Sequence, residues 1–150
     1  MFAALLTLAA LVGPPWISIE YPANPMDPTS HNAYLLIHTF HHGEAVDAPL
    51  TGEAVTWENG RRRALTLHFE TTSRPGVYQL SKQWTDGSPY VLMITVGEGD
   101  HGSATALVSV SSAGTVTKVE VPSNPYRDVR VPRAPTDSDL NAAFRAAGGR

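Results

Sequence analysis

Six histidines are the residues of this 150-residue chain whose chemistry and spacing could build a metal site. Imidazole nitrogens bind copper and zinc, and a methionine thioether adds affinity for copper. His38, His41 and His42 stand close together in the sequence. On a strand, alternate side chains point to opposite faces, so His38 and His42 share one face and His41 takes the other. One straight strand therefore cannot bring all three to a single metal ion.

A copper or zinc site would need histidines from different strands. If the strands that carry His38 and His68 are neighbours, their ends come together. His42, His68 and His101 then converge, and a nearby methionine, Met26, can add a thioether. The candidate metal ligands are His41, His42, His68 and His101. The alternative is a set of histidines dispersed at strand ends, because no spacing signature of a metal site supports the group.

Catalytic chemistry has little support in the sequence. The chain has no cysteine, which excludes disulfides, thiol catalysis, iron–sulfur clusters and thiolate zinc sites. It contains no Gly-x-Ser-x-Gly elbow, phosphate loop or zinc-protease motif. Asp100, His101 and Ser103 lie almost side by side, and residues so close along a chain rarely aim at one atom. We therefore predict that the protein is not an enzyme.

The charge pattern gives no reason to expect nucleic acid. The chain carries 11 basic and 14 acidic side chains, a net charge of −3. Its densest basic run, Arg61–Arg63, follows the dipeptide Asn59-Gly60 directly. Asn-Gly favours a tight hairpin turn, so the run is interpreted as a solvated strand edge whose charges discourage edge-to-edge pairing.

The segments that must position these side chains are predicted to be strands. Short apolar or alternating runs recur about every ten residues, with glycine, proline, asparagine or aspartate between them. The run after Asn59-Gly60 alternates most clearly and should turn Leu65, Leu67 and Phe69 inward. The expected strands cover residues 16–21, 33–41, 54–58, 62–69, 77–84, 90–96, 104–110 and 116–121.

Seven or eight such strands predict an all-β, Ig-like sandwich of antiparallel sheets. The chain, 42% apolar, is long enough for one domain with a substantial core. The aromatic residues Trp57, Trp84, Tyr78 and Tyr90 are expected in core and corner packing rather than on a binding surface. The predicted core is Ile17, Ile19, Leu35, Ile37, Val55, Trp57, Leu65, Leu67, Tyr78, Leu80, Leu92, Ile94, Leu107 and the valines of the last hairpin.

Residues 1–13 are predicted to be a signal peptide that precedes the sandwich domain, residues 14–121. Phe2–Val12 is uninterrupted in small and apolar residues, and a helix of this length rises about 16 Å, too little to span a membrane. No lysine or arginine precedes the run, so the alternative is an apolar helix or strand packed on the domain. Export predicts a periplasmic or secreted protein with no stable membrane span after cleavage.

Residues 122–150 form a proline-containing tail with five arginines and three aspartates. Prolines should keep its first half extended. Thr136, Asp137 or Ser138 can cap a short helix that ends before Gly148-Gly149, with Leu140 and Phe144 on one side. Because a helix of about ten residues is marginal alone, the tail either frays or docks on something.

Several stretches resemble bacterial YtkA-like domains and, more loosely, the carboxypeptidase regulatory-like and other transthyretin-like sandwiches. They cover about residues 16–97 and read Gly43-Glu44-Ala45-Val46, Gly52-Glu53-Ala54-Val55-Thr56-Trp57, Pro75-Gly76-Val77-Tyr78, then Trp84, Asp86-Gly87 and Tyr90-Val91-Leu92. The resemblance implies an exported Ig-like module without catalytic activity. Such modules lie near membranes or beside other envelope proteins.

Together these observations predict a non-catalytic exported module for protein–protein or envelope interactions. Its partner would be an unidentified protein of the cell envelope, bound through an open sheet edge or the loops at one end. It would need no cofactor. The alternative is a periplasmic protein that binds copper or zinc through surface histidines.

Overall fold

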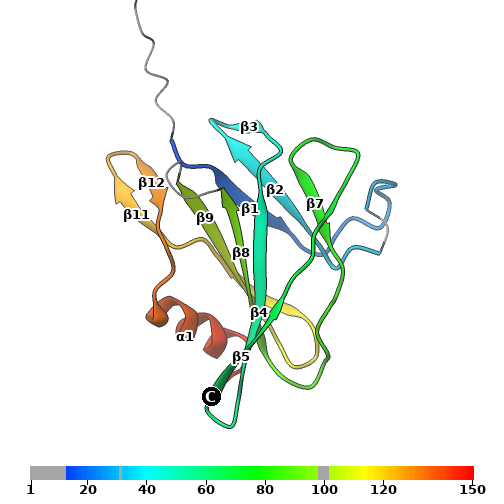
Figure 1. Ribbon diagram of the computed structural model, residues 1–150, viewed down its shortest axis with the longest axis vertical. Coiled ribbons are helices and arrows are strands. Elements are labelled where there is room, and N and C mark those ends of the chain that lie inside the picture. Colours follow the sequence, from blue (N-terminus) through cyan, green and yellow to red (C-terminus); the bar gives the residue numbers. More distant parts are fainter. Residues whose placement is uncertain (1–12, 31, 98–101) are drawn as a thin grey trace, which may run out of the picture.

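The chain folds as an all-β sandwich of two antiparallel sheets, which confirms the predicted fold class (Figure 1). The computed structural model describes residues 13–30, 32–97 and 102–150. Within these ranges lie twelve strands and one helix. They are β1 (Trp16–Glu20), β2 (Leu35–His41), β3 (Glu44–Ala45), β4 (Leu50–Glu58), β5 (Arg61–Thr66), β6 (Glu70–Thr71), β7 (Val77–Leu80), β8 (Tyr90–Gly97), β9 (Ser103–Val110), β10 (Val116–Glu120), β11 (Ser123–Tyr126), β12 (Val129–Pro132) and α1 (Asp137–Ala146).

The first sheet has the order β1-β2-β7-β6, with β3 added beside β2, and the second has the order β10-β9-β8-β4-β5. The eight longer strands of the two sheets correspond to the eight segments predicted from the alternation. β3 and β6 have two residues each, and β11 pairs with β12 in a separate hairpin of the tail. These four short strands were not predicted.

Two tight turns of the same kind close the hairpins β4–β5 and β2–β3. Asn59 and Gly60 have φ angles of 51° and 73°, as the type I′ turn predicted at this dipeptide requires. His42 and Gly43 have φ angles of 51° and 80°, so a second such turn joins β2 to β3. The turn carries His42 out of β2 and leaves it exposed.

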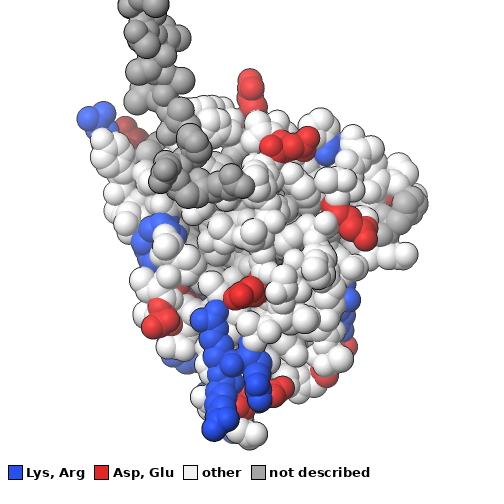
Figure 2. All heavy atoms as spheres, viewed as in Figure 1, with Lys and Arg blue, Asp and Glu red and all other residues white. Residues whose placement is uncertain are grey.

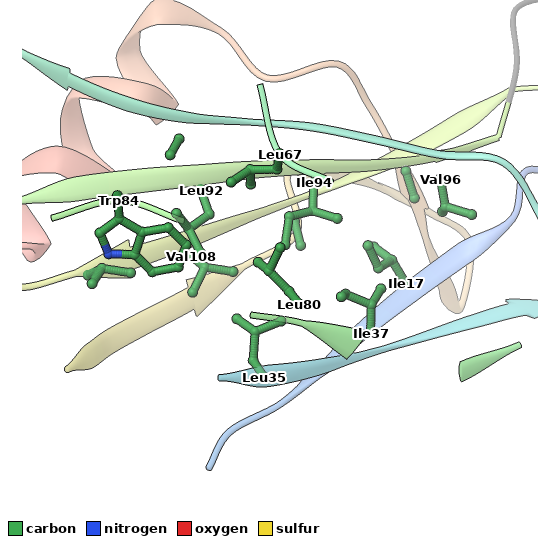
Figure 3. Packing of buried hydrophobic residues seen from close by; sticks show 14 residues of the cluster. Ile17, Leu35, Ile37, Leu67, Leu80, Trp84, Leu92, Ile94, Val96 and Val108 are labelled. Carbon is green, nitrogen blue, oxygen red and sulfur yellow. The ribbon is translucent and has the colours of Figure 1, made fainter. Parts of the chain in front are cut away.

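The main core fills the space between the sheets. Figure 3 shows Ile17, Ile37 and Leu80 of the first sheet facing Ile94 and Val96 of the second. The two sheets are therefore held together by close apolar packing, with no solvent gap at these positions. Its buried members are Ile17, Leu35, Ile37, Ala54, Leu67, Leu80, Trp84, Leu92, Ile94, Val96, Ala104, Ala106, Val108 and Val110.

The prediction that Leu65 belongs to this core is wrong. Leu65 is 42% exposed, whereas Leu67 is 4% exposed. β5 is the outermost strand of its sheet and ends at Thr66, so Leu65 has a strand neighbour on one side only. The chain then crosses toward the first sheet, and this crossing carries Leu67 into the core.

A second apolar cluster lies on the outer face of the second sheet, beneath α1. Leu140, Ala143 and Phe144 of the helix pack there against Val91 and Leu107. The ring of Trp57 joins the cluster, with its centroid 4.3 Å from that of Phe144. Trp57 and Leu107 were both predicted to belong to the core between the sheets, but they belong to this outer cluster.

Of the two outcomes left open for the tail, the structure shows docking. The Ser109 hydroxyl donates to the Ala143 carbonyl at 2.8 Å, and the Thr117 hydroxyl donates to the Ala146 carbonyl at 2.8 Å. The Ala143 carbonyl also accepts from the Ala147 N–H, whereas the Ala146 carbonyl belongs to the last residue of α1, where backbone acceptors lack helical partners. In the part of the chain that the structure describes, no helix is long and apolar enough to cross a membrane.

The start of α1 is fixed by a capping box at Thr136, one of the three residues predicted as possible caps. The Asp139 N–H donates to the Thr136 hydroxyl, and the Thr136 N–H donates to Asp139 Oδ2 at 2.8 Å. Arg133 Nη2 donates to Asp139 Oδ1 at 2.9 Å. The Arg133 guanidinium and the two Thr136 groups lower the pKa of Asp139 well below its usual range.

Replacement of Asp139 with asparagine is expected to destabilise the protein by about 1 kcal/mol at pH 7, the size of a lost cap. Because the folded-state pKa lies below the unfolded value of about 3.9, the ionised carboxylate stabilises the fold above that value and loses its effect as the pH falls. The difference between wild type and D139N in urea unfolding should therefore shrink from pH 7 to about pH 3. The exposed Asp137, replaced in the same way, is the control, and a difference independent of pH would contradict the assignment.

Candidate functional site

His41 and His42 lie together at one end of the sandwich. Their ring centroids are 4.2 Å apart, and His41 Nε2 donates to the carbonyl oxygen of Gly13 at 2.8 Å. This hydrogen bond uses one of the two nitrogens with which His41 could bind a metal. The structure thus brings two of the four candidate ligands together, with His41 tied to the chain that leads into β1.

His68 lies apart from this pair, in the crossing between β5 and β6. Its backbone N–H donates to Gln83 Oε1 at 2.9 Å, and Gln83 Nε2 donates back to the His68 carbonyl at 2.7 Å. Gln83 follows β7, whose residue Leu80 pairs with Leu35 at the start of β2, while His41 ends β2. The expected meeting of His68 with the other histidines needed β2 beside β5, but β2 pairs with β1, β3 and β7.

The fourth candidate ligand, His101, lies outside the described residues. Met26 is in the loop between β1 and β2 and is 85% exposed. Among residues 13–30, 32–97 and 102–150, no group of three or more histidine, aspartate or glutamate side chains could hold a metal ion. Within the described ranges, His41 and His42 are together and His68 lies apart from them.

His38 has a different partner, which the sequence did not reveal. Its Nε2 lies 2.8 Å from Glu20 Oε2, and its ring stacks on Phe40 with an interplanar angle of 8°. The register of β1 on β2 places Glu20 opposite Leu36, so Glu20 reaches His38 diagonally on the same face. Only the strand register could have shown this pair.

The predicted aromatic packing is confirmed at Trp84, which is 6% exposed. Its ring meets Tyr34 edge-on at 5.0 Å, and the Tyr34 hydroxyl donates to the Gly114 carbonyl at 2.8 Å. Burial raises the pKa of Tyr34 above its usual value. Burial also raises the pKa of Tyr78, whose hydroxyl donates to the Ala48 carbonyl. These aromatic side chains close the ends of the core.

The most accessible feature of the sandwich is β5, which we call the basic edge (Arg61–Thr66). All six residues are exposed, and β5 pairs with β4 on one side as the last strand of its sheet. Figure 2 shows basic side chains gathered at the end of the molecule where β5 and the C-terminus lie. The prediction of a solvated, charged hairpin edge agrees with this exposure.

The arginines of the basic edge are held loosely. Arg62 Nη2 lies 3.5 Å from Glu53 Oε2, and Arg63 Nε lies 3.6 Å from Glu58 Oε2. The side chains of both pairs are about half exposed, and exposed pairs at such distances contribute little to stability. No ion pair of Arg61 is found within the described ranges. The guanidinium groups can therefore turn to a bound anion at small cost.

The other edge strands of the two sheets are shorter. β6 has two residues, and β1 and β10 have five each. β10 also has a register shift between Val116 and Lys118, and a bulged edge is poorly suited to pair with another strand. β5 is thus the longest edge strand of the two sheets and has no register shift in its pairing with β4.

A shallow groove of about 520 Å³ adjoins the basic edge. It separates the β4–β5 turn from the C-terminal end of α1 and is lined in part by Trp57, Asn59, Phe144, Arg145 and Arg150. This groove was not predicted, because it forms only when the tail helix docks beside the hairpin.

Comparison with protein-family models, curated proteins and solved structures gives no match. The similarity to YtkA-like domains therefore remains a prediction from the residues.

Proposed function

We propose that this protein is a non-catalytic exported binding module that receives an extended acidic segment of an envelope protein along the basic edge. The observation that carries the proposal is the six-residue edge strand, exposed at every position, with arginine at three of them. The exported location rests on the apolar residues 2–12 of the sequence. We propose that β5 recognises the main chain of the bound segment and the negative charge of its side chains.

Strand addition explains how such an edge would bind. An extended segment beside β5 exchanges main-chain hydrogen bonds with its free side, which give affinity without requiring a particular sequence. Side chains of the added strand then lie directly opposite those of β5. Arg61 and Arg63 lie on one face of β5 and Arg62 on the other, so carboxylates on either face of the added strand would meet an arginine. The arginine fork donates two hydrogen bonds to a carboxylate. An acidic segment is therefore preferred over a neutral one.

A second copy of the chain is a poor occupant of this edge. Antiparallel pairing of two β5 strands over their full length would set Arg62 and Arg63 of one copy diagonally across from Arg63 and Arg62 of the other, within reach of long side chains. Edge charges are a common protection against such self-pairing. The same arginines that oppose a second copy thus favour an acidic strand.

The test is titration with two synthetic peptides, one alternating glutamate with valine and one alternating lysine with valine. The wild-type chain should bind the glutamate peptide, with backbone amide shifts in NMR spectra concentrated on β4 and β5. Reversal of the three charges (R61E, R62E and R63E together) should weaken that binding about ten-fold, equivalent to about 1.4 kcal/mol, and should favour the lysine peptide.

The test also needs a control variant and a stated contradicting result. Arg127→Glu is the control, since Arg127 is an exposed arginine of the β11–β12 turn rather than of the basic edge. It should leave binding of the glutamate peptide unchanged. Equal binding of both peptides by wild type, or binding that is insensitive to the triple reversal, would refute the proposal.

A further inference from the structure

The β4–β5 turn contains the one asparagine of the chain that is followed by glycine, Asn59. An asparagine carboxamide can react with the backbone nitrogen of the next residue, and glycine hinders this approach least because it has no β-carbon. The other asparagines precede proline or alanine. Proline has no N–H to give up, and the methyl group of alanine obstructs the reaction. The sequence chemistry therefore distinguishes Asn59 from every other asparagine of the chain.

The structure leaves both reacting groups of this dipeptide accessible. Asn59 and Gly60 are exposed, and no atom of a non-adjacent residue lies within 4 Å of a β-carbon added at Gly60. Among the described residues, no hydrogen bond holds the Asn59 carboxamide or the Gly60 N–H. The hairpin is closed by the pairing of the flanking residues Glu58 and Arg61. The Gly60 nitrogen can therefore react without the loss of a hydrogen bond.

A second turn of the chain, Asp86-Gly87, is the structural contrast. Aspartate followed by glycine can form the same cyclic imide. Here, however, the Gly87 N–H donates to the Ser112 carbonyl at 2.8 Å, and the Asp86 carboxylate is paired with Lys82. Both reacting groups are thus engaged by other residues. The two turns have similar sequences but opposite availability of the attacking nitrogen.

We propose that Asn59-Gly60 is a site of spontaneous modification, at which asparagine is converted to aspartate and isoaspartate. The Gly60 nitrogen bonds to Asn59 Cγ, the bond from Cγ to Nδ2 breaks, and ammonia leaves with the proton of the Gly60 N–H. Water then opens the cyclic imide. Attack at Cγ gives aspartate, whereas attack at the main-chain carbonyl carbon leaves the chain running through Cγ, as isoaspartate. Either product carries one new carboxylate.

The charges around the turn favour this reaction. Arg61 follows the dipeptide, and Arg145 lines the same groove as Asn59 and Gly60. Positive charge stabilises the deprotonated amide nitrogen that attacks, and it also stabilises the carboxylate of the product. The carboxylate of Glu58, which precedes the turn, lies 3.6 Å from Arg63 Nε, so its opposing charge is partly offset.

The modification changes the basic edge, and this part of the inference rests on the proposed binding of an acidic segment there. A new negative charge beside Arg61–Arg63 repels carboxylates of the bound segment. Isoaspartate also lengthens the main chain within a two-residue turn whose geometry fixes the register of β5 on β4. Conversion at Asn59 therefore weakens the binding surface as the protein ages.

The first test measures the conversion itself, on the full chain incubated at physiological temperature and pH and analysed by mass spectrometry of its peptides. Asn59 should convert at least about ten-fold faster than any other asparagine. Asp86→Asn places a second Asn-Gly pair in the same chain, with the Gly87 N–H still bonded to Ser112. It should convert about ten-fold more slowly than Asn59. Conversion of Asn59 no faster than that of the alanine-linked Asn32, or equal conversion at both Asn-Gly pairs, would overturn the inference.

The second test measures the effect on binding. Asn59→Asp should bind the glutamate peptide about two-fold more weakly than wild type, the size of one exposed charge interaction. Asn124→Asp adds the same charge on an exposed residue of β11 and should leave binding unchanged. Equal binding by wild type and N59D would overturn the effect on the basic edge. If the wild type does not bind the peptide, the proposed function fails with that effect, while the conversion at Asn59 is still measured independently.

Discussion

Replacement of Phe144 with alanine is expected to lower the free energy of unfolding by about 3 to 5 kcal/mol, the usual cost of removing a buried phenyl ring. Phe144 is 8% exposed and fills the space between α1 and the outer face of the second sheet. Its ring packs on Trp57 at 4.3 Å, and Gly149 closes over it so tightly that a β-carbon there would lie 2.2 Å from Phe144 Cε1. Neither α1 nor the second sheet can move into the cavity left by the ring without losing other contacts.

Urea unfolding followed by tryptophan fluorescence and circular dichroism measures the loss. Trp57 should also move to a more polar environment before the main transition, because α1 is held by few other apolar contacts. Asn141→Ala is the control, since Asn141 is an exposed residue of the same helix. A loss below about 1 kcal/mol for Phe144→Ala would mean that the helix does not rely on this ring.

Replacement of Gly76 with alanine is expected to cost about 3 kcal/mol, combining a left-handed backbone with a steric clash. Gly76 has a φ of 68°, and an added β-carbon would lie 2.8 Å from the Thr39 carbonyl oxygen and 2.9 Å from the Val46 nitrogen. Both neighbours are backbone atoms of the first sheet and its connection. The Gly76 N–H also donates to Asp47 Oδ1 at 2.7 Å, and the Gly76 carbonyl accepts from the Thr39 N–H. A shift of the backbone to relieve the clash would break these bonds.

Gly43→Ala provides a matched comparison. Gly43 has a φ of 80°, but no atom lies within 4 Å of the β-carbon that alanine would add. Only the backbone cost of about 1 to 2 kcal/mol should remain. Thermal and urea unfolding of both variants should therefore separate conformational strain from the clash, and equal losses would contradict the close packing around Gly76.

Alternation and turn residues were sufficient to predict the eight longer strands. Those signals are local, since each strand shows its own period of two and each turn its own glycine or asparagine. Burial of individual side chains was harder to predict. Leu65 and Leu67 follow the same alternation, yet β5 ends between them and only Leu67 is buried. Trp57 is similarly apolar, but the partner that covers it, Phe144, is distant in the sequence.

The candidate sites show the same limit. The sequence identified histidines as potential ligands but contained no information on which strands become neighbours. β2 does not pair with β5, so His68 is separated from His41 and His42. The exposure of Arg61–Arg63 was predictable because these residues adjoin a tight turn. That β5 would be the longest edge strand of its sheet followed only from the order of the paired strands.

Docking of α1 also affects the order in which the parts of the fold can pack during synthesis. Every residue of β9 from Ala104 to Val110 is buried, and its outer face is covered by a helix that begins only at Asp137. During synthesis, a helix made after all the strands of this sheet therefore covers its outer face. A chain cut before α1 would keep both sheets but expose Val91, Leu107 and Trp57 together, a continuous apolar surface prone to aggregation.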